Sequence, residues 1–245
     1  MRVELSGIKA ARRVIAGLAD APPMMLSPYM SAAAGQPFYY KCEMMQPIGA
    51  FKLRGAMNAV ANLPKGTRGV TCCSTGNHGR GVAYAAAKAG VRAVICMSEL
   101  VPDAKVEGIR ALGAEVRIIG RSQDEAQVEA LRLVAEEGLV EISPFDDGYV
   151  IAGQGTIGIE MLETVPELEA IYVPLSGGGL AAGVATAAKA LKPDIKIYGI
   201  SMERGAAMYE SLRAGAPLDV EEVPSLADSL GGGIGLANQL SVAAW

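Results

Sequence analysis

The segment that decides the fold reads GVTCCSTGNHGRGVAYAAAKAGVRAVICM and spans residues 69–97. An apolar run at 69–73 predicts a strand, an Ala-rich stretch at 77–89 predicts a helix, and a second apolar run at 91–97 predicts another strand. Two parallel strands in one sheet are joined through a helix by a right-handed crossover. The segment therefore predicts a parallel sheet with helices packed against it.

The same alternation continues toward the C-terminus. We expect a helix from Pro102 and Asp103 to about Leu112, ended by Gly113, then a strand at 115–119. Ser122 and Glu125 form a possible capping box for a helix that continues through Glu137. The later expected elements are a strand at 170–175, a helix at 180–191 and a strand at 195–201. We predict an α/β protein with two open, largely parallel sheets.

Each expected sheet is assigned to its own domain. Residues 66–149 would form a small α/β domain. Residues 1–65 and 150–245 would form a large domain, because we expect the N-terminal segment to return to the second sheet. With 245 residues, of which 51% are apolar, the chain is long enough to bury the cores that this arrangement needs.

Composition and charge exclude several classes of protein. The 22 basic and 26 acidic residues are interspersed, with a net charge of -4 and no basic run, so we expect no nucleic-acid partner. No stretch of about 20 consecutive apolar residues is present, so we expect no membrane span. The N-terminus, MRVELSGIKAARR, lacks the apolar region of a secretory signal.

Cysteine and histidine usage narrows the chemistry further. The four cysteines (Cys42, Cys72, Cys73 and Cys96) show no CxxC spacing, and we expect a cytoplasmic protein. Cys72 and Cys73 stand side by side in an apolar, strand-like run, so we expect these two to be buried free thiols. His78 is the single histidine, which excludes an HExxH motif and any multi-histidine zinc site within one chain. Difficult chemistry would therefore need a cofactor.

Two loops that follow expected strands are rich in small residues. The first is STGNHG at 74–79, and the second is SGGG at 176–179. Ligands of open α/β sheets bind where strands end and helices begin, and glycine-rich loops there let backbone amides approach an anion. The alternative is that both loops are merely tight strand-to-helix turns.

A lysine stands in an unusual setting within PIGAFKLRGA at 47–56. Most lysines are solvated surface charges, but Lys52 follows an aromatic residue in an apolar stretch flanked by glycines. Desolvation lowers the pKa of a lysine and frees its amine to form a Schiff base. A reactive lysine combined with a phosphate cradle and an anion-binding loop describes a pyridoxal phosphate site.

A third glycine pattern suggests a different cofactor. Gly153, Gly155 and Gly158 match GxGxxG, the spacing found in dinucleotide-binding proteins. However, the match stands at an expected helix start near Gln154, without a strong preceding strand. It leaves a nucleotide-binding dehydrogenase as a minor alternative.

Four stretches, taken in order, resemble the fold-type II pyridoxal-phosphate enzymes, which share the fold of tryptophan synthase β. They are GAFKLRGA, STGNHGRG, VIAGQGTIGIE and VPLSGGGL. The sequence is most similar to the group of serine/threonine dehydratases (ammonia-lyases) and serine racemases, and GISMERGAAM also resembles dehydratases of hydroxyectoine utilisation. The likeness covers nearly the whole chain.

The resemblance implies a role for each motif residue. Lys52 would carry the cofactor as an imine, Phe51 would pack against the pyridine ring, and Asn77 would contact the 3-hydroxyl group. The cofactor phosphate would be bound by Ser176, Gly177, Gly178, Gly179 and Leu180. The substrate carboxylate would be held by the loop of Ser74, Thr75, Gly76, Asn77 and His78.

Three departures from the family pattern stand out. Thr75 replaces the serine that acts as the second-face acid in serine racemases, which disfavours racemisation. Ser201 and Ala207 stand where relatives with a divalent cation place carboxylates, so we expect no metal site. The chain ends at Trp245, where relatives continue with further strand and helix units, so we expect the larger sheet to be C-terminally truncated.

The resemblance implies α,β-elimination of a β-hydroxy amino acid, similar to threonine or serine, to a 2-oxo acid and ammonia. The remaining alternatives are an amino-acid racemase and a non-catalytic remnant of a dehydratase. We expect a small amino-acid substrate, no nucleic-acid or membrane partner, and allow for a homodimer.

Overall fold

A computed structural model describes residues 3–74 and 76–244 of the chain. Its largest sheet has four parallel strands in the order β5-β4-β3-β6. The bounds of these strands are β3 (Val70–Cys73), β4 (Ala93–Met97), β5 (Glu115–Ile118) and β6 (Val140–Glu141). The predicted first sheet is thus confirmed, including its parallel strands.

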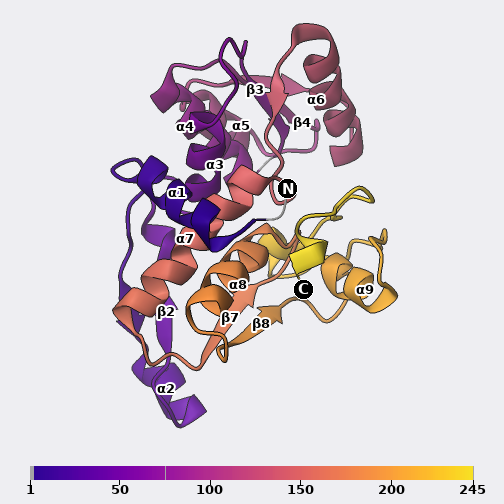
Figure 1. Ribbon diagram of the computed structural model, residues 1–245. Coiled ribbons are helices and arrows are strands. Elements are labelled where there is room, and N and C mark those ends of the chain that lie inside the picture. The colour runs from indigo at the N-terminus through magenta and orange to yellow at the C-terminus, as the bar shows by residue number, and fades with distance from the viewer. Residues whose placement is uncertain (1–2, 75, 245) are drawn as a thin grey trace.

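Three helices pack around this sheet, in the upper part of Figure 1. They are α4 (Asn77–Ala89), α5 (Asp103–Arg110) and α6 (Gln123–Glu137). The expected capping box at the start of α6 is present, because Ser122 and Glu125 bond each other's backbone amides. Helix α5 ends two residues earlier than predicted, before Gly113, which takes a φ of +86°.

Alternation along β3 places its two cysteines on opposite faces of the sheet. Cys72 packs in the core shared with α3 and α4, whereas Cys73 packs with Ala126, Ala130 and Leu133 of α6. All four cysteines are buried and free, which confirms the prediction made for Cys72 and Cys73.

A second parallel pair, β7 (Ala170–Pro174) and β8 (Lys196–Ile200), lies in the lower part of the molecule. The N-terminal segment contacts this pair through side chains, because Phe38, directly before β2 (Tyr39–Lys41), stacks on Tyr172 of β7 with 6.1 Å between the ring centroids. Its own strands, β1 (Met24–Leu26) and β2, form a separate antiparallel pair on either side of α2 (Pro28–Ala34). Prolines at 22, 23, 28 and 37 flank both strands, and residues without an amide donor restrict strands to short edges.

The remaining elements lie outside the strands of these sheets. The helices are α1 (Leu5–Ile15), α3 (Lys52–Ala61), α7 (Gly148–Thr164), α8 (Gly179–Leu191) and α9 (Ala207–Ala214), with short 3-10 turns η1 (Glu43–Met45), η2 (Asp228–Leu230) and η3 (Val242–Ala244). Figure 1 shows α7 running diagonally through the middle, below the four-stranded sheet and beside α1 and α8. The division into two domains remains a prediction.

The GxGxxG pattern lies inside α7 rather than at a helix start, which corrects the sequence-based expectation. The helix begins at Gly148, and the Asp147 side chain caps it by accepting the Val150 amide. A Cβ atom on Gly153 would lie 2.6 Å from the Arg54 carbonyl oxygen, and one on Gly155 would lie 2.9 Å from that of Gly183. These glycines let α3 and α8 pack closely on α7, and they do not form the strand-to-helix turn that dinucleotide binding needs.

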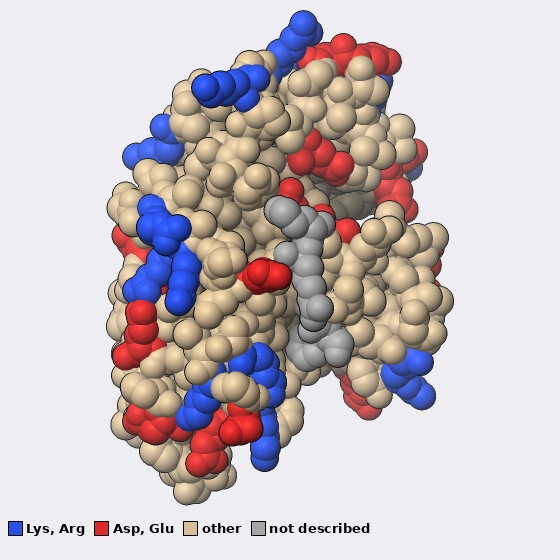
Figure 2. All heavy atoms as spheres, viewed as in Figure 1, with Lys and Arg blue, Asp and Glu red and all other residues tan. Residues whose placement is uncertain are grey.

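No helix within residues 3–74 and 76–244 is long and apolar enough to cross a membrane. On the face shown in Figure 2, Lys and Arg side chains are interspersed with Asp and Glu. The same view shows a recess between the upper part of the molecule and the lower right part that carries α9.

Candidate active site

Lys52 is the first residue of α3 and is partly buried. Its Nζ donates a hydrogen bond to the Pro144 carbonyl oxygen at 2.7 Å and lies 5.5 Å from the centre of the Phe51 ring. Within the described residues no carboxylate lies within 4 Å of this amine. Desolvation therefore lowers the pKa of Lys52 to about 8. The amine is available in its neutral form near neutral pH.

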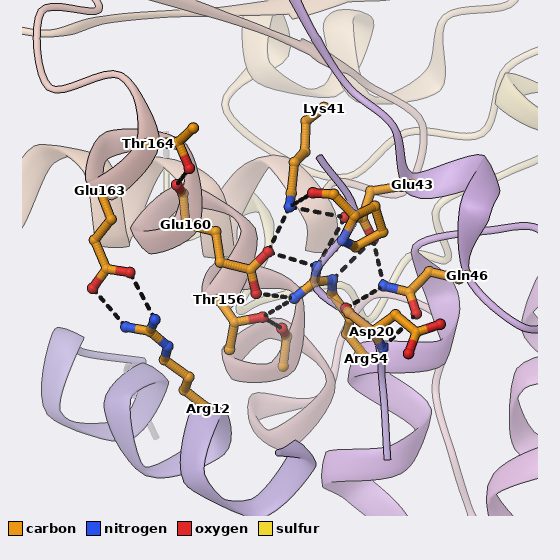
Figure 3. Close-up of polar contacts among 12 residues, drawn as sticks. Arg12, Asp20, Lys41, Glu43, Gln46, Arg54, Thr156, Glu160, Glu163 and Thr164 are labelled. Carbon is orange, nitrogen blue, oxygen red and sulfur yellow. Dashed lines mark hydrogen bonds and ion pairs between the residues drawn. The ribbon is translucent and has the colours of Figure 1, made fainter. Parts of the chain in front are cut away.

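Arg54 lies two residues farther along α3 in a very different environment, shown in Figure 3. Its guanidinium is 1% exposed and forms paired hydrogen bonds of 2.6–2.9 Å with both Glu43 and Glu160. Lys41 contacts Glu160 at 2.6 Å, and Thr156 accepts a further bond from Arg54 at 3.0 Å. Burial alone would lower the pKa of Arg54, but the two carboxylates reverse this and raise it.

This buried ion cluster of Lys41, Glu43, Arg54 and Glu160 fixes the position of α3. The four side chains come from β2, η1, α3 and α7, and their formal charges cancel. Sequence reasoning missed the cluster. Because the partners are 11 and 106 residues away from Arg54, only the fold brings them together.

The first predicted loop leads from β3 into α4. Its N-cap is Gly76, which has no side chain to cap the helix, and no acidic residue stands in the first turn. Ser74, Gly76 and Asn77 are each partly buried at this helix start. Thr75 lies outside the described residues. The first amides of a helix favour an anion, so this loop suits a carboxylate.

His78 is the second residue of α4 and is 3% exposed. Its Nε2 is 2.7 Å from the Ile142 carbonyl oxygen. Burial, followed by the charge on Lys52, lowers the pKa of His78 to about 3, so the ring is neutral. Its Nδ1 is buried and has no hydrogen-bond partner among the described residues.

The second predicted loop leads from β7 into α8. Gly178 is the N-cap of α8 with a φ of +89°, and the structure gives this helix no side-chain cap. A Cβ atom on Gly178 would lie 2.6 Å from Cε of Met208. Gly177, Gly178 and Gly179 are buried, while Ser176 and Leu180 are partly exposed. This position therefore requires glycine, and the helix start suits an anion such as phosphate.

One segment, residues 142–147 between β6 and α7, brings the predicted site residues together; we call it the connector. Its carbonyl oxygens at Ile142 and Pro144 contact His78 and Lys52. The Phe145 ring lies so close to Gly177 that a Cβ atom there would be 2.0 Å from it. Sequence reasoning missed the connector, although the run PFDD before a helix start was a usable signal.

These residues fit pyridoxal phosphate. The cofactor carries an aldehyde that reacts with a neutral amine and a phosphate that needs backbone donors. The chain provides a desolvated Lys52 and the glycine-capped start of α8, and the connector contacts both. The unpaired Nδ1 of His78 is a further buried polar atom in the same region. No cluster of metal-ligating side chains is found among residues 3–74 and 76–244.

Comparisons with known proteins agree with this geometry. Two related proteins match almost the whole chain: one from Sinorhizobium fredii assigned as a threonine dehydratase, 53% identical over 96% of this chain, and an L-threonine ammonia-lyase from Thermotoga maritima, 41% identical over 93%. The structure of maize serine racemase superposes with a TM-score of 0.94 at 34% identity, covering all of this chain and 74% of that one.

The chain spans 72% of the Sinorhizobium fredii protein and 57% of the Thermotoga maritima protein. The family model described as "Pyridoxal-phosphate dependent enzyme" matches residues 17–244. The match confirms the expected fold type, and the cofactor follows from it. The chain therefore belongs to the family of pyridoxal-phosphate dependent enzymes.

Proposed function

We propose that this protein eliminates water from a β-hydroxy amino acid such as threonine or serine and releases a 2-oxo acid and ammonia. The observation that carries the proposal is the partly buried Lys52, whose pKa of about 8 results from desolvation without a nearby carboxylate. The names of the relatives from Sinorhizobium fredii and Thermotoga maritima support this reaction over others in the family.

Each predicted site residue has a part in this proposal. Lys52 would hold the cofactor through Nζ beside Phe51, and Asn77 at the start of α4 would contact its ring hydroxyl. The cofactor phosphate would lie at the start of α8, bound by Ser176, Gly177, Gly178, Gly179 and Leu180. The substrate carboxylate would lie at the start of α4, bound by Ser74, Thr75, Gly76, Asn77 and His78.

The chemistry then divides between the cofactor and the protein. When bound, pyridoxal phosphate supplies a conjugated ring that accepts the electron pair left at the α-carbon. Lys52 takes the α-proton on Nζ, for which its amine must first be neutral. The β-hydroxyl leaves with a proton as water. The resulting enamine later takes up one water molecule and releases ammonia, so the net loss from the substrate is ammonia alone.

The experiment measures formation of ammonia and 2-oxo acid from L-threonine and L-serine by the pyridoxal-phosphate-loaded protein. We expect equal amounts of the two products and their loss in Lys52→Ala. Lys65→Ala is the matched control, because Lys65 is exposed, and it should keep wild-type turnover. Undiminished product formation by Lys52→Ala would contradict the proposal.

Amino-acid racemisation is a second candidate, favoured by the superposition with maize serine racemase. The residue that disfavours it, Thr75, lies outside the described residues. Chiral analysis of recovered serine in the same assay separates the two activities, because a racemase yields D-serine without ammonia. We further propose a cytoplasmic location, since the four cysteines are free thiols.

A further inference from the structure

The His78 side chain makes a buried contact outside the loop that precedes α4. A carbonyl oxygen only accepts hydrogen bonds, so the 2.7 Å contact with Ile142 requires the proton on Nε2. Nδ1 then carries a bare lone pair, which has no partner among the described residues. A buried acceptor without a donor costs about 1–3 kcal/mol, so a purely structural role would favour an apolar side chain here.

The hydrogen-bond partner of His78 belongs to the connector. Two carbonyl oxygens of the connector, at Ile142 and Pro144, accept hydrogen bonds from side chains. Strand β6 ends at Glu141, and the last contact of this segment with the sheet is the Ile142 amide donating to Thr71 at 2.9 Å. The Ile142 carbonyl then accepts from His78, and the Pro144 carbonyl accepts from Lys52. The two side chains are thus joined through three residues of backbone.

The far end of the connector is held separately. The Asp146 carboxylate accepts the amides of Gln239, Leu240 and Ser241, the shortest at 2.7 Å. Phe145 lies against Gly177 and Gly179. The position of the Pro144 carbonyl therefore depends on anchors on both sides, and His78 is the side-chain anchor on the side of the sheet.

We propose that His78 is a positioning residue for Lys52: its Nε2 fixes the connector at Ile142, so that the Pro144 carbonyl holds the Lys52 amine in its desolvated place. The proposal rests on the proposed role of Lys52 as the reactive lysine.

The electrostatics suit this role. Two titratable side chains act on the charges of Lys52 and His78. Cys72 on β3 acts on Lys52, and Lys52 itself acts on His78. Burial raises the pKa of the Cys72 thiol well above its usual value, so it is neutral. His78 is neutral as well, because burial lowers its pKa to about 3. Lys52 is thus the one member of this trio that titrates near pH 8.

The test measures the reactivity of the Lys52 amine without any cofactor. Wild-type protein and variants are labelled with 2,4-dinitrofluorobenzene between pH 6 and 10.5, and labelling at Lys52 is followed by peptide mass spectrometry. We expect a midpoint near pH 8 in the wild type. In His78→Leu the freed connector lets water reach Nζ, so the midpoint rises by about one pH unit or more, and labelling at pH 7 falls roughly tenfold.

Two variants distinguish the loss of positioning at the Lys52 amine from a general loosening of the structure around α3. His78→Gln keeps an amide donor near the place of Nε2 and should restore a midpoint near 8. Asn58→Leu removes another buried side-chain bond on α3, to the Tyr149 carbonyl at 2.7 Å, and should leave the midpoint unchanged. Should His78→Leu not fold, His78→Asn, whose amide is too short to reach Ile142, replaces it.

A second, independent measurement reports which ring nitrogen of His78, the single histidine, carries the proton. In protein labelled with ¹⁵N-histidine, the ring should appear as the neutral Nε2–H form at pH 7. An unshifted Lys52 midpoint in His78→Leu, an equal shift in Asn58→Leu, or an Nδ1–H ring would each overturn the inference. If the midpoints shift as expected but pyridoxal phosphate fails to attach to Lys52, the proposed function fails while this inference stands.

Discussion

Lys52 and Arg54 are two basic residues within the first turn of the same helix, and they differ in the charged groups that surround them. Arg54 is surrounded by Glu43 and Glu160 within an ion cluster that is neutral in sum. Lys52 lies within 4 Å of no carboxylate among the described residues and bonds a backbone carbonyl instead. The pKa of Arg54 is consequently raised, and that of Lys52 is lowered to about 8.

One helix, α3, thus holds a structural charge at Arg54 and a reactive amine at Lys52. Paired hydrogen bonds to two carboxylates keep Arg54 charged and fix α3 against α7 and η1. The absence of compensation at Lys52 costs stability but raises the share of the neutral amine near neutral pH, because its pKa is lowered to about 8. The cluster therefore provides the rigid support on which the reactive lysine depends.

The largest effect is expected from making the same substitution at both positions. Arg54→Met removes the paired hydrogen bonds of the partly buried Glu43 and Glu160, leaves Lys41 as the one cation of the cluster, and should lower the free energy of unfolding by about 3–5 kcal/mol. Lys52→Met removes an uncompensated, desolvated amine and should leave the stability of the cofactor-free protein unchanged or raise it. Urea unfolding of both variants measures the contrast. Similar losses in the two variants would mean that the environments do not differ as described.

The second effect concerns the glycine-rich loop before α8, where we propose that the cofactor phosphate binds. Gly178→Ala places a side chain on a residue with a φ of +89° and brings Cβ to 2.6 Å from Met208. Left-handed backbone costs roughly 1–2 kcal/mol and overpacking about 1–3 kcal/mol, so a total loss of about 2–5 kcal/mol is expected. Affinity for pyridoxal phosphate, titrated by absorbance, should fall as well. Unchanged affinity would remove this loop from the phosphate site.

A smaller effect, on the free energy of unfolding, is expected from His78 at acidic pH. His78 has a pKa of about 3 in the folded state and 6.5 as its ordinary value, so the unfolded chain binds the proton first. The stability from neutral His78 is fully present above pH 6.5 and is lost progressively as the pH falls toward 3. At pH 5 the loss is about 2 kcal/mol. His78→Gln should lack this part of the decrease between pH 7 and 5, as measured by urea unfolding at both pH values. Identical pH dependence of the two proteins would show that His78 has the same pKa in the folded protein as in the unfolded chain.

Much of the fold could be predicted because its signals are local. The helix at 77–89 is bounded by glycines, and the capping box at Ser122 is contained within four residues. The start of α7 was misplaced, because glycines that serve helix packing resemble the start of a helix in sequence. The pairing of β1 with β2 and the ion cluster around Arg54 depend on contacts between distant residues, which no local pattern encodes.

The site could be predicted as a set of residues but not as an arrangement. Lys52 stood out through its apolar, glycine-flanked setting, and both loops stood out through their small residues. What links them is the connector, whose backbone carbonyls and Phe145 ring act through position rather than through a recognisable motif.

The central claim is that the uncompensated amine of Lys52 is where pyridoxal phosphate attaches. Its most direct test is reduction of the protein with borohydride after incubation with the cofactor at pH 8, followed by peptide mapping of the pyridoxyl group. We expect the pyridoxyl group on the peptide that contains Lys52 and no such group in Lys52→Met. A pyridoxyl group on Lys41 or Lys65, with Lys52 unmodified, would contradict it.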